Sequence, residues 1–176
     1  MMLPPPAGSP YRVSMVCLGN ICRSPMAAAV LRSRVDEAGL GDLVHVDSGG
    51  TGSWHVGDAA DPRARDALAR RGYDGSSHRA RQVSAPWFDD HDLLLVMDDD
   101  NLRTVRRLAP DPAAAERVML LRMFDPLAEP AGDRIVPDPY YGDEADFDVG
   151  LDIIERCVDG LLPLLRARVE GSETQR

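Results

Sequence analysis

Two cysteines, an arginine and a serine lie close together near the start of the chain. The stretch 15–25 reads MVCLGNICRSP, so Cys22 follows Cys17 by five positions and Arg23 follows it by six. Four kinds of structure use these residue types: a metal site, a disulfide, an inert buried loop and an anion pocket with a nucleophile. Ser24 then opens an alanine-rich segment that is typical of a helix.

The metal and disulfide alternatives fit the rest of the chain poorly. A zinc site needs about four ligands, but Cys157 lies far away within a helical pattern and the histidines are scattered. Three cysteines are an odd number and do not form a secreted disulfide framework. We therefore expect no metal and no cofactor, and we expect Cys157 to be an inert core residue.

The anion pocket explains more of the stretch. A turn from a strand into a helix directs successive backbone N–H groups into a concavity that binds anions. The same positive potential would stabilise a thiolate at Cys17. The planar guanidinium of Arg23 matches two phosphate oxygens at once, and Ser24 could hydrogen-bond the thiolate. This combination suits attack on a phosphate ester with formation of a phosphocysteine.

The nonapeptide CLGNICRSP, placed directly behind a strand, resembles the phosphate loop of the low-molecular-weight protein tyrosine phosphatases. Residues 136–142, VPDPYYG, resemble the general-acid loop of that family, and HRARQV, VMDDDNL and the total length are also similar. The resemblance covers roughly residues 12–168.

The resemblance implies a role for each matching residue. Cys17 is the expected nucleophile, Arg23 the phosphate clamp, and Ser24 the support for the thiolate as it leaves. Asp138 is the expected general acid and then general base, since a phenolic leaving group needs a proton; Asp125, also before a proline, is its competitor. The expected phosphate-binding residues are Leu18, Gly19, Asn20, Ile21, Cys22 and Arg23.

Further residues are expected to shape the pocket and hold the loop. Tyr140 and Tyr141, with Trp54 opposite, are the expected walls for an aromatic ring, in a slot too deep for phosphoserine. Asn20, Ser48 and His78 match a network that holds the phosphate loop, with Asn20 suited to left-handed backbone.

Two roles in this region stay open, while the resemblance assigns a role to His78. His78 is expected to be structural, not a catalytic base, and the other histidines are expected at the surface. Asp98 is either only a helix cap or also a support for the site. Cys22 is either a packing residue or a redox partner, whose reversible disulfide with Cys17 would protect the thiolate.

Other functions remain to be weighed against the phosphotyrosine phosphatase. Arsenate reductases share the loop but need further cysteines downstream, where this chain has only Cys157. Protein-arginine phosphatases usually have threonine at the position of Ile21. A phosphate-binding module without catalysis would lack a nucleophile or an acid, and this sequence has candidates for both.

The elements that must position these residues alternate between strand and helix patterns. Strands are expected at 11–18, 42–48, 91–97 and 116–121, and helices at 24–38, 61–72, 98–110 and 147–168, with Ser24 as a cap and Pro163 interrupting the last helix. The pattern and the resemblance imply an α/β fold of three layers. A central four-stranded parallel twisted sheet is flanked by helices, and the phosphate loop follows the first strand. A single domain is expected over 12–169, between flexible tails at 1–11 and 170–176.

Composition limits the partners. The net charge is −9 and the pI about 4.8, which argues against nucleic acid or an anionic membrane surface as a ligand. No apolar run approaches the roughly 18 residues of a membrane span, and the first ten residues do not read as a signal peptide. We expect a cytoplasmic monomer that acts on tyrosine-phosphorylated proteins.

Overall fold

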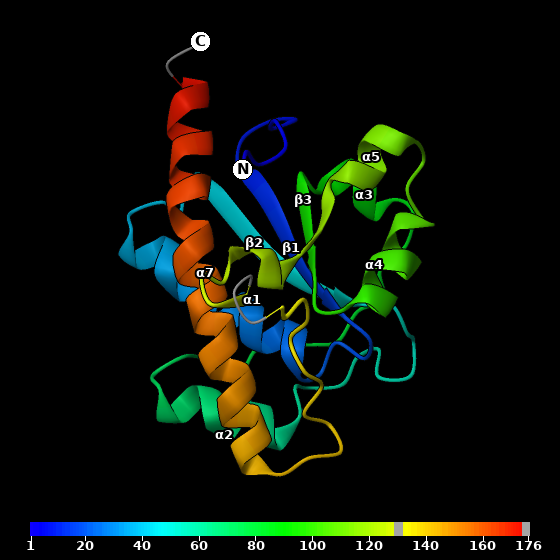
Figure 1. Ribbon diagram of the computed structural model, residues 1–176, viewed down its shortest axis with the longest axis vertical. Coiled ribbons are helices and arrows are strands. Elements are labelled where there is room, and N and C mark those ends of the chain that lie inside the picture. Colours follow the sequence, from blue (N-terminus) through cyan, green and yellow to red (C-terminus); the bar gives the residue numbers. More distant parts are fainter. Residues whose placement is uncertain (129–131, 174–176) are drawn as a thin grey trace.

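A computed structural model describes residues 1–128 and 132–173 (Figure 1). In this part of the chain a parallel sheet has the strand order β2-β1-β3-β4. Its strands are β1 (Tyr11–Cys17), β2 (Val44–Gly50), β3 (Leu93–Val96) and β4 (Val118–Leu120). The expected four-stranded parallel sheet is therefore confirmed.

Helices cover both faces of the sheet. They are α1 (Arg23–Glu37), α2 (Pro62–Arg70), α3 (Trp87–Asp90), α4 (Asp99–Arg106), α5 (Pro112–Glu116), the 3₁₀ helix η1 (Leu121–Phe124) and α7 (Glu144–Glu173). Figure 1 shows α1, α2 and α7 together beside one face and α3, α4 and α5 beside the other. The expected three-layer arrangement follows from this placement.

The strand sequences dictate this burial on two sides. In β3, Leu93 and Leu95 pack into the larger hydrophobic cluster with α1 and α7, whereas Leu94 and Val96 pack into the smaller cluster with α4. Successive side chains of a strand point to opposite faces. A continuous apolar run such as LLLV therefore belongs to a parallel strand covered on both faces.

Residues 1–11 do not form the free tail that the sequence suggested. Leu3 is buried, and its carbonyl accepts a hydrogen bond from Arg168 in α7. The hydroxyl of Tyr11 donates to the Pro4 carbonyl at 3.1 Å, and the amide of Ala7 donates to Asp92 at 2.7 Å. Apolar burial and these bonds fix a proline-rich segment that local composition alone marks as loose.

The last helix is longer than expected at both ends. It begins at Glu144 and continues through Pro163 to Glu173, so residues 170–173 of the expected tail are helical. The remainder of that tail, 174–176, lies outside the described residues, as do residues 129–131. No helix in the described ranges is long and apolar enough to cross a membrane.

The packing of α7 on η1 leads to a stability prediction. A Cβ built at Gly160 would lie 2.0 Å from the carbonyl oxygen of Phe124, so Gly160→Ala should lower the free energy of unfolding by about 1–3 kcal/mol. In the same helix, a Cβ at Gly150 meets no heavy atom within 4 Å. Gly150→Ala should therefore raise stability by about 0.5–1 kcal/mol. Denaturant unfolding of both variants measures this contrast, and equal stability of the two would contradict the close approach.

Candidate active site

The phosphate loop connects the end of β1 to the start of α1. Cys17 is the last residue of β1 and is 3% exposed, and the amide of Asn20 donates to its sulfur at 3.3 Å. The hydroxyl oxygen of Ser24 lies 3.0 Å from the same sulfur. The amide of Asn20 and the hydroxyl of Ser24 therefore converge on Sγ, and both are able to donate to a negative charge there.

Ser24 does not cap α1 as the sequence predicted. The helix begins one residue earlier, at Arg23, and its N-cap is Cys22, which makes no side-chain capping bond. The Ser24 hydroxyl also lies 3.3 Å from the carbonyl oxygen of Gly49, to which it can donate. Its single proton serves either that carbonyl or the Cys17 sulfur, and a thiolate would attract it more strongly.

Asn20 holds the loop in shape. It has the left-handed backbone that was expected, with φ of 56°. Its side-chain NH₂ donates to Ser24 at 2.8 Å and to Ser48 at 3.0 Å, and its side-chain oxygen accepts from the amide of Arg81 at 2.8 Å. Its backbone carbonyl lies 2.6 Å from Nε2 of His78. The structure thus brings together the three residues expected to support the loop, and it adds Arg81.

Arg23 connects the phosphate loop to two acids. Its guanidinium is buried and donates to Asp98 at 2.8 Å, to the Val136 carbonyl at 3.1 Å and to Asp138 at 3.2 Å. The other oxygen of Asp98 accepts from the amide of Asn101 at 2.8 Å, where it caps α4. Asp98 therefore has both of the roles that the sequence left open: it caps α4 and contacts the site.

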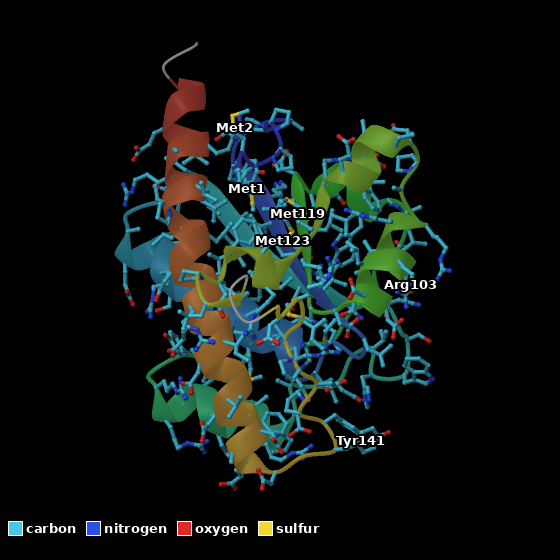
Figure 2. All side chains as sticks on the ribbon, viewed as in Figure 1. Met1, Met2, Arg103, Met119, Met123 and Tyr141 are labelled. Carbon is cyan, nitrogen blue, oxygen red and sulfur yellow. The ribbon has the colours of Figure 1, made fainter. Side chains whose placement is uncertain are left out.

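A cavity of about 230 Å³ opens above Cys17. It is lined by Cys17, Leu18, Gly19, Ile21, Cys22, Arg23, Trp54, His55, Asp138, Tyr140 and Tyr141. Tyr140 is 38% exposed, Trp54 73% and Tyr141 97%, so Tyr140 stands deeper in the wall than the other two rings. Figure 2 shows Tyr141 projecting outward from the loop before α7. The rings of Tyr140 and Tyr141 meet edge to face, 4.9 Å apart.

Sequence reasoning misplaced two histidines and overlooked two arginines. His91, expected at the surface, is buried, and its Nε2 lies 2.8 Å from the Asp47 carboxylate. His55, expected at the surface, lines the cavity, and its Nδ1 lies 3.1 Å from Asp58. Its position beside Trp54 was the available signal. Arg63 and Arg81 contact the loops around the site. Asp125, the competing acid, is instead buried beside Arg156 and does not line the cavity.

The two remaining cysteines are buried thiols. Burial raises the pKa of Cys22, and the nearby carboxylate of Asp61 raises it further. Burial raises the pKa of Cys157 to about 12, and this residue packs in the larger hydrophobic cluster. Cys157 therefore has the surroundings of an inert core residue, whereas Cys22 shares the cavity with Cys17.

Comparison with known proteins identifies the family of this chain. Residues 12–171 match the family described as low molecular weight phosphotyrosine protein phosphatase. A low molecular weight protein-tyrosine-phosphatase of Streptomyces coelicolor is 53% identical over 161 residues, which are 92% of this chain and 97% of that protein. The low molecular weight protein-tyrosine phosphatase A of Mycobacterium tuberculosis is 45% identical over 86% of this chain and 90% of its own.

The comparison with solved structures agrees with the comparison of sequences. A crystal structure of a protein tyrosine phosphatase from Entamoeba histolytica has a TM-score of 0.83 and 34% identity, and it covers 92% of this chain and 99% of that one. The chain belongs to the low molecular weight phosphotyrosine protein phosphatase family. The expected fold and enzyme class are thereby confirmed.

The half-buried ring of His78 generates a pH prediction. Burial lowers the pKa of His78, and the charges of Arg32, Arg81 and Arg79 lower it further. The folded state therefore binds this proton less readily than the unfolded chain. The free energy of unfolding should fall as the pH drops through the unfolded-state value of about 6.5.

The matched variant is His78→Gln, whose amide keeps a donor near the Asn20 carbonyl but does not titrate. Denaturant unfolding is measured at about pH 8 and about pH 5, on either side of the unfolded-state pKa of histidine. The loss of stability between these two pH values should be smaller in His78→Gln than in the wild type. Equal losses in the two proteins would mean that His78 titrates as freely in the folded state as in the unfolded chain.

Proposed function

We propose that this phosphatase hydrolyses phosphotyrosine in proteins with Cys17 as the nucleophile and Asp138 as the proton donor. The observation that carries the assignment is their convergence: Cys17, Arg23 and Asp138 line one cavity, and Arg23 donates to Asp138 at 3.2 Å. A nucleophile, an anion clamp and an acid within one pocket are the three parts that phosphate ester cleavage needs.

In the first step the Cys17 thiolate attacks phosphorus, so that a P–S bond forms while the P–O bond to the phenol breaks. Backbone amides of the phosphate loop and the guanidinium of Arg23 bind the phosphate oxygens as charge moves onto them. Asp138 gives its proton to the departing phenolate oxygen. In the free enzyme Arg23 pairs with Asp138, and a bound phosphate dianion competes for the same guanidinium.

In the second step a water molecule attacks the phosphocysteine. Asp138, now a carboxylate, takes a proton from this water, the P–S bond breaks, and inorganic phosphate and the thiolate result. Ser24 lies 3.0 Å from the sulfur and donates to it as its negative charge returns. Asn20 also donates to that sulfur through its amide, so both donors lower the energy of the leaving thiolate.

The walls of the cavity favour an aryl ester. Cys17 is nearly fully buried, whereas Tyr140 is partly exposed and Trp54 is largely exposed. The nucleophile therefore lies at the base of the cavity, and these aromatic side chains lie at its mouth. A phosphotyrosine places its phosphate one ring length from the backbone and can stack its ring on these side chains. A phosphoserine side chain is shorter and would leave the rings without a partner.

Hydrolysis of aryl phosphates by two variants tests the assignment. Cys17→Ser should lose at least about 10³-fold in kcat, because a neutral hydroxyl replaces the thiolate. Asp138→Ala should lose roughly 10²–10⁴-fold in kcat/KM with phenyl phosphate and much less with 4-nitrophenyl phosphate, whose leaving group needs no proton. Appreciable turnover by Cys17→Ser would contradict the role of Cys17 as the nucleophile. Equal losses of kcat/KM on both substrates in Asp138→Ala would contradict the role of Asp138 as the proton donor.

Cys22 is proposed as a redox partner of Cys17. Both thiols line the same cavity, five positions apart in one loop. Peroxide would oxidise Cys17 to the sulfenic acid, and the Cys22 thiol would condense with it, forming the disulfide and releasing water. A dithiol then restores both thiols. The sulfinic acid, which dithiols do not reduce, is thereby avoided.

Recovery after oxidation tests this role. Wild-type enzyme inactivated by peroxide should regain most of its activity with a dithiol, whereas Cys22→Ser should recover severalfold less. Cys157→Ser is the matched control, because Cys157 lies in the core and not in the cavity. If Cys22→Ser and the wild type recover equally, Cys22 only packs the loop.

A further inference from the structure

Arg63, in the first turn of α2, binds the loop that carries Asp138. Its Nη1 donates to the carbonyl oxygen of Gly142 and its Nη2 to that of Tyr140, both at 3.0 Å. These carbonyls belong to one turn, which closes where the amide of Gly142 donates to the Pro139 carbonyl at 2.9 Å. One rigid guanidinium therefore holds two points of the acid loop at once.

The same guanidinium is fixed from its other side. Its Nε lies 3.1 Å and its Nη2 2.9 Å from the two carboxylate oxygens of Asp61. Asp61 also caps α2, where it accepts from the amide of Arg63 at 2.9 Å. The backbone amide of Asp61 donates to the carbonyl oxygen of Ile21 at 2.8 Å, which lies in the phosphate loop.

Aromatic rings further restrict Arg63. Its guanidinium carbon lies 4.6 Å from the ring centre of Phe147 and 5.9 Å from that of Tyr140. Phe147 is buried in α7, so it gives the guanidinium a fixed surface. An arginine held by a carboxylate, two carbonyls and two rings has little freedom, and the groups that it binds share this restriction.

The contacts connect the phosphate loop to the general acid through a short chain of hydrogen bonds. That chain runs from Ile21 to Asp61, from Asp61 to Arg63, and from Arg63 to the carbonyl of Tyr140. The amide of Tyr140 in turn donates to Asp138 at 3.1 Å. That bond occupies one carboxylate oxygen, whereas the other accepts from Arg23 in the free enzyme and becomes available for proton transfer when a bound phosphate takes over Arg23.

We propose that Arg63 is a positioning residue that sets the distance between the Asp138 carboxyl group and the substrate oxygen bound in the phosphate loop. The proposal rests on the proposed function of Asp138 as the acid. Arg63 does not touch the reacting atoms; it fixes the acid loop to the phosphate loop through Asp61. A displacement of the acid by about 1 Å can cost up to roughly 10²-fold in rate.

The test compares kcat/KM of Arg63→Gln on two aryl phosphates, one with a poor leaving group and one with a good leaving group. Loss of the guanidinium should lower kcat/KM with phenyl phosphate by roughly 10-fold to 10²-fold and with 4-nitrophenyl phosphate by less than about threefold. The inhibition constant of inorganic phosphate should stay within about twofold of the wild type, because the phosphate loop itself is unchanged. Arg63→Lys, which keeps the charge but not the fork, should give an intermediate loss and provides a second readout if Arg63→Gln folds poorly.

Arg70→Gln is the matched control. Arg70 lies in the same helix and pairs with Asp148 of α7 at 3.0 Å, and within residues 1–128 and 132–173 it makes no hydrogen bond or ion pair with the acid loop or the phosphate loop. It should leave both substrates unaffected. Equal losses of Arg63→Gln on the two substrates, unchanged kinetics, or weaker phosphate inhibition would each overturn the positioning role. A failure of the acid assignment is distinguishable, because Asp138→Ala would then also lack any dependence on the leaving group.

Discussion

The site depends on the buried carboxamide of Asn20. Its two N–H bonds go to Ser24 and Ser48, and its oxygen accepts from the backbone of Arg81, so a fully buried polar group finds partners on three segments. Leaving any of these atoms unpaired in the interior would cost about 1–3 kcal/mol. The same bonds compensate for the left-handed backbone of Asn20, which turns its amide toward the Cys17 sulfur.

The parallel sheet makes this convergence possible. Neighbouring parallel strands end at one edge, and the loops that follow them meet there. Cys17 ends β1, Ser48 and Gly49 lie at the end of β2, and Asp98 follows β3. The apolar strands thus have two functions: they bury the core on both faces, and they bring polar side chains from distant parts of the chain to one rim. Arg23 binds acids from two of the arriving loops.

Much of the fold and of the site could be predicted from the sequence. The strand at 91–97 was evident because a fully apolar run is needed where both faces of a sheet are covered. Ser24 was misread as a cap because serine before a helical segment usually caps it, and only the folded loop offers its hydroxyl a sulfur and a carbonyl. The N-terminal segment was misread because composition does not reveal that Leu3 finds a buried position beside α7.

The sequence by itself determined the chemistry. Cys17, Arg23 and the Asp138-Pro139 turn are recognisable because reactive groups and turn residues at short spacing define local geometry. The sequence favoured Asp138 over Asp125 through the VPDPYYG resemblance, but only the tertiary structure brings Asp138 to Arg23, which lies 115 positions away in the chain. The tertiary structure also decided that Asp98 serves both a helix and the site and that Arg63 joins two loops. Contacts of this kind depend on strand order and helix packing, which a local pattern of residues does not encode.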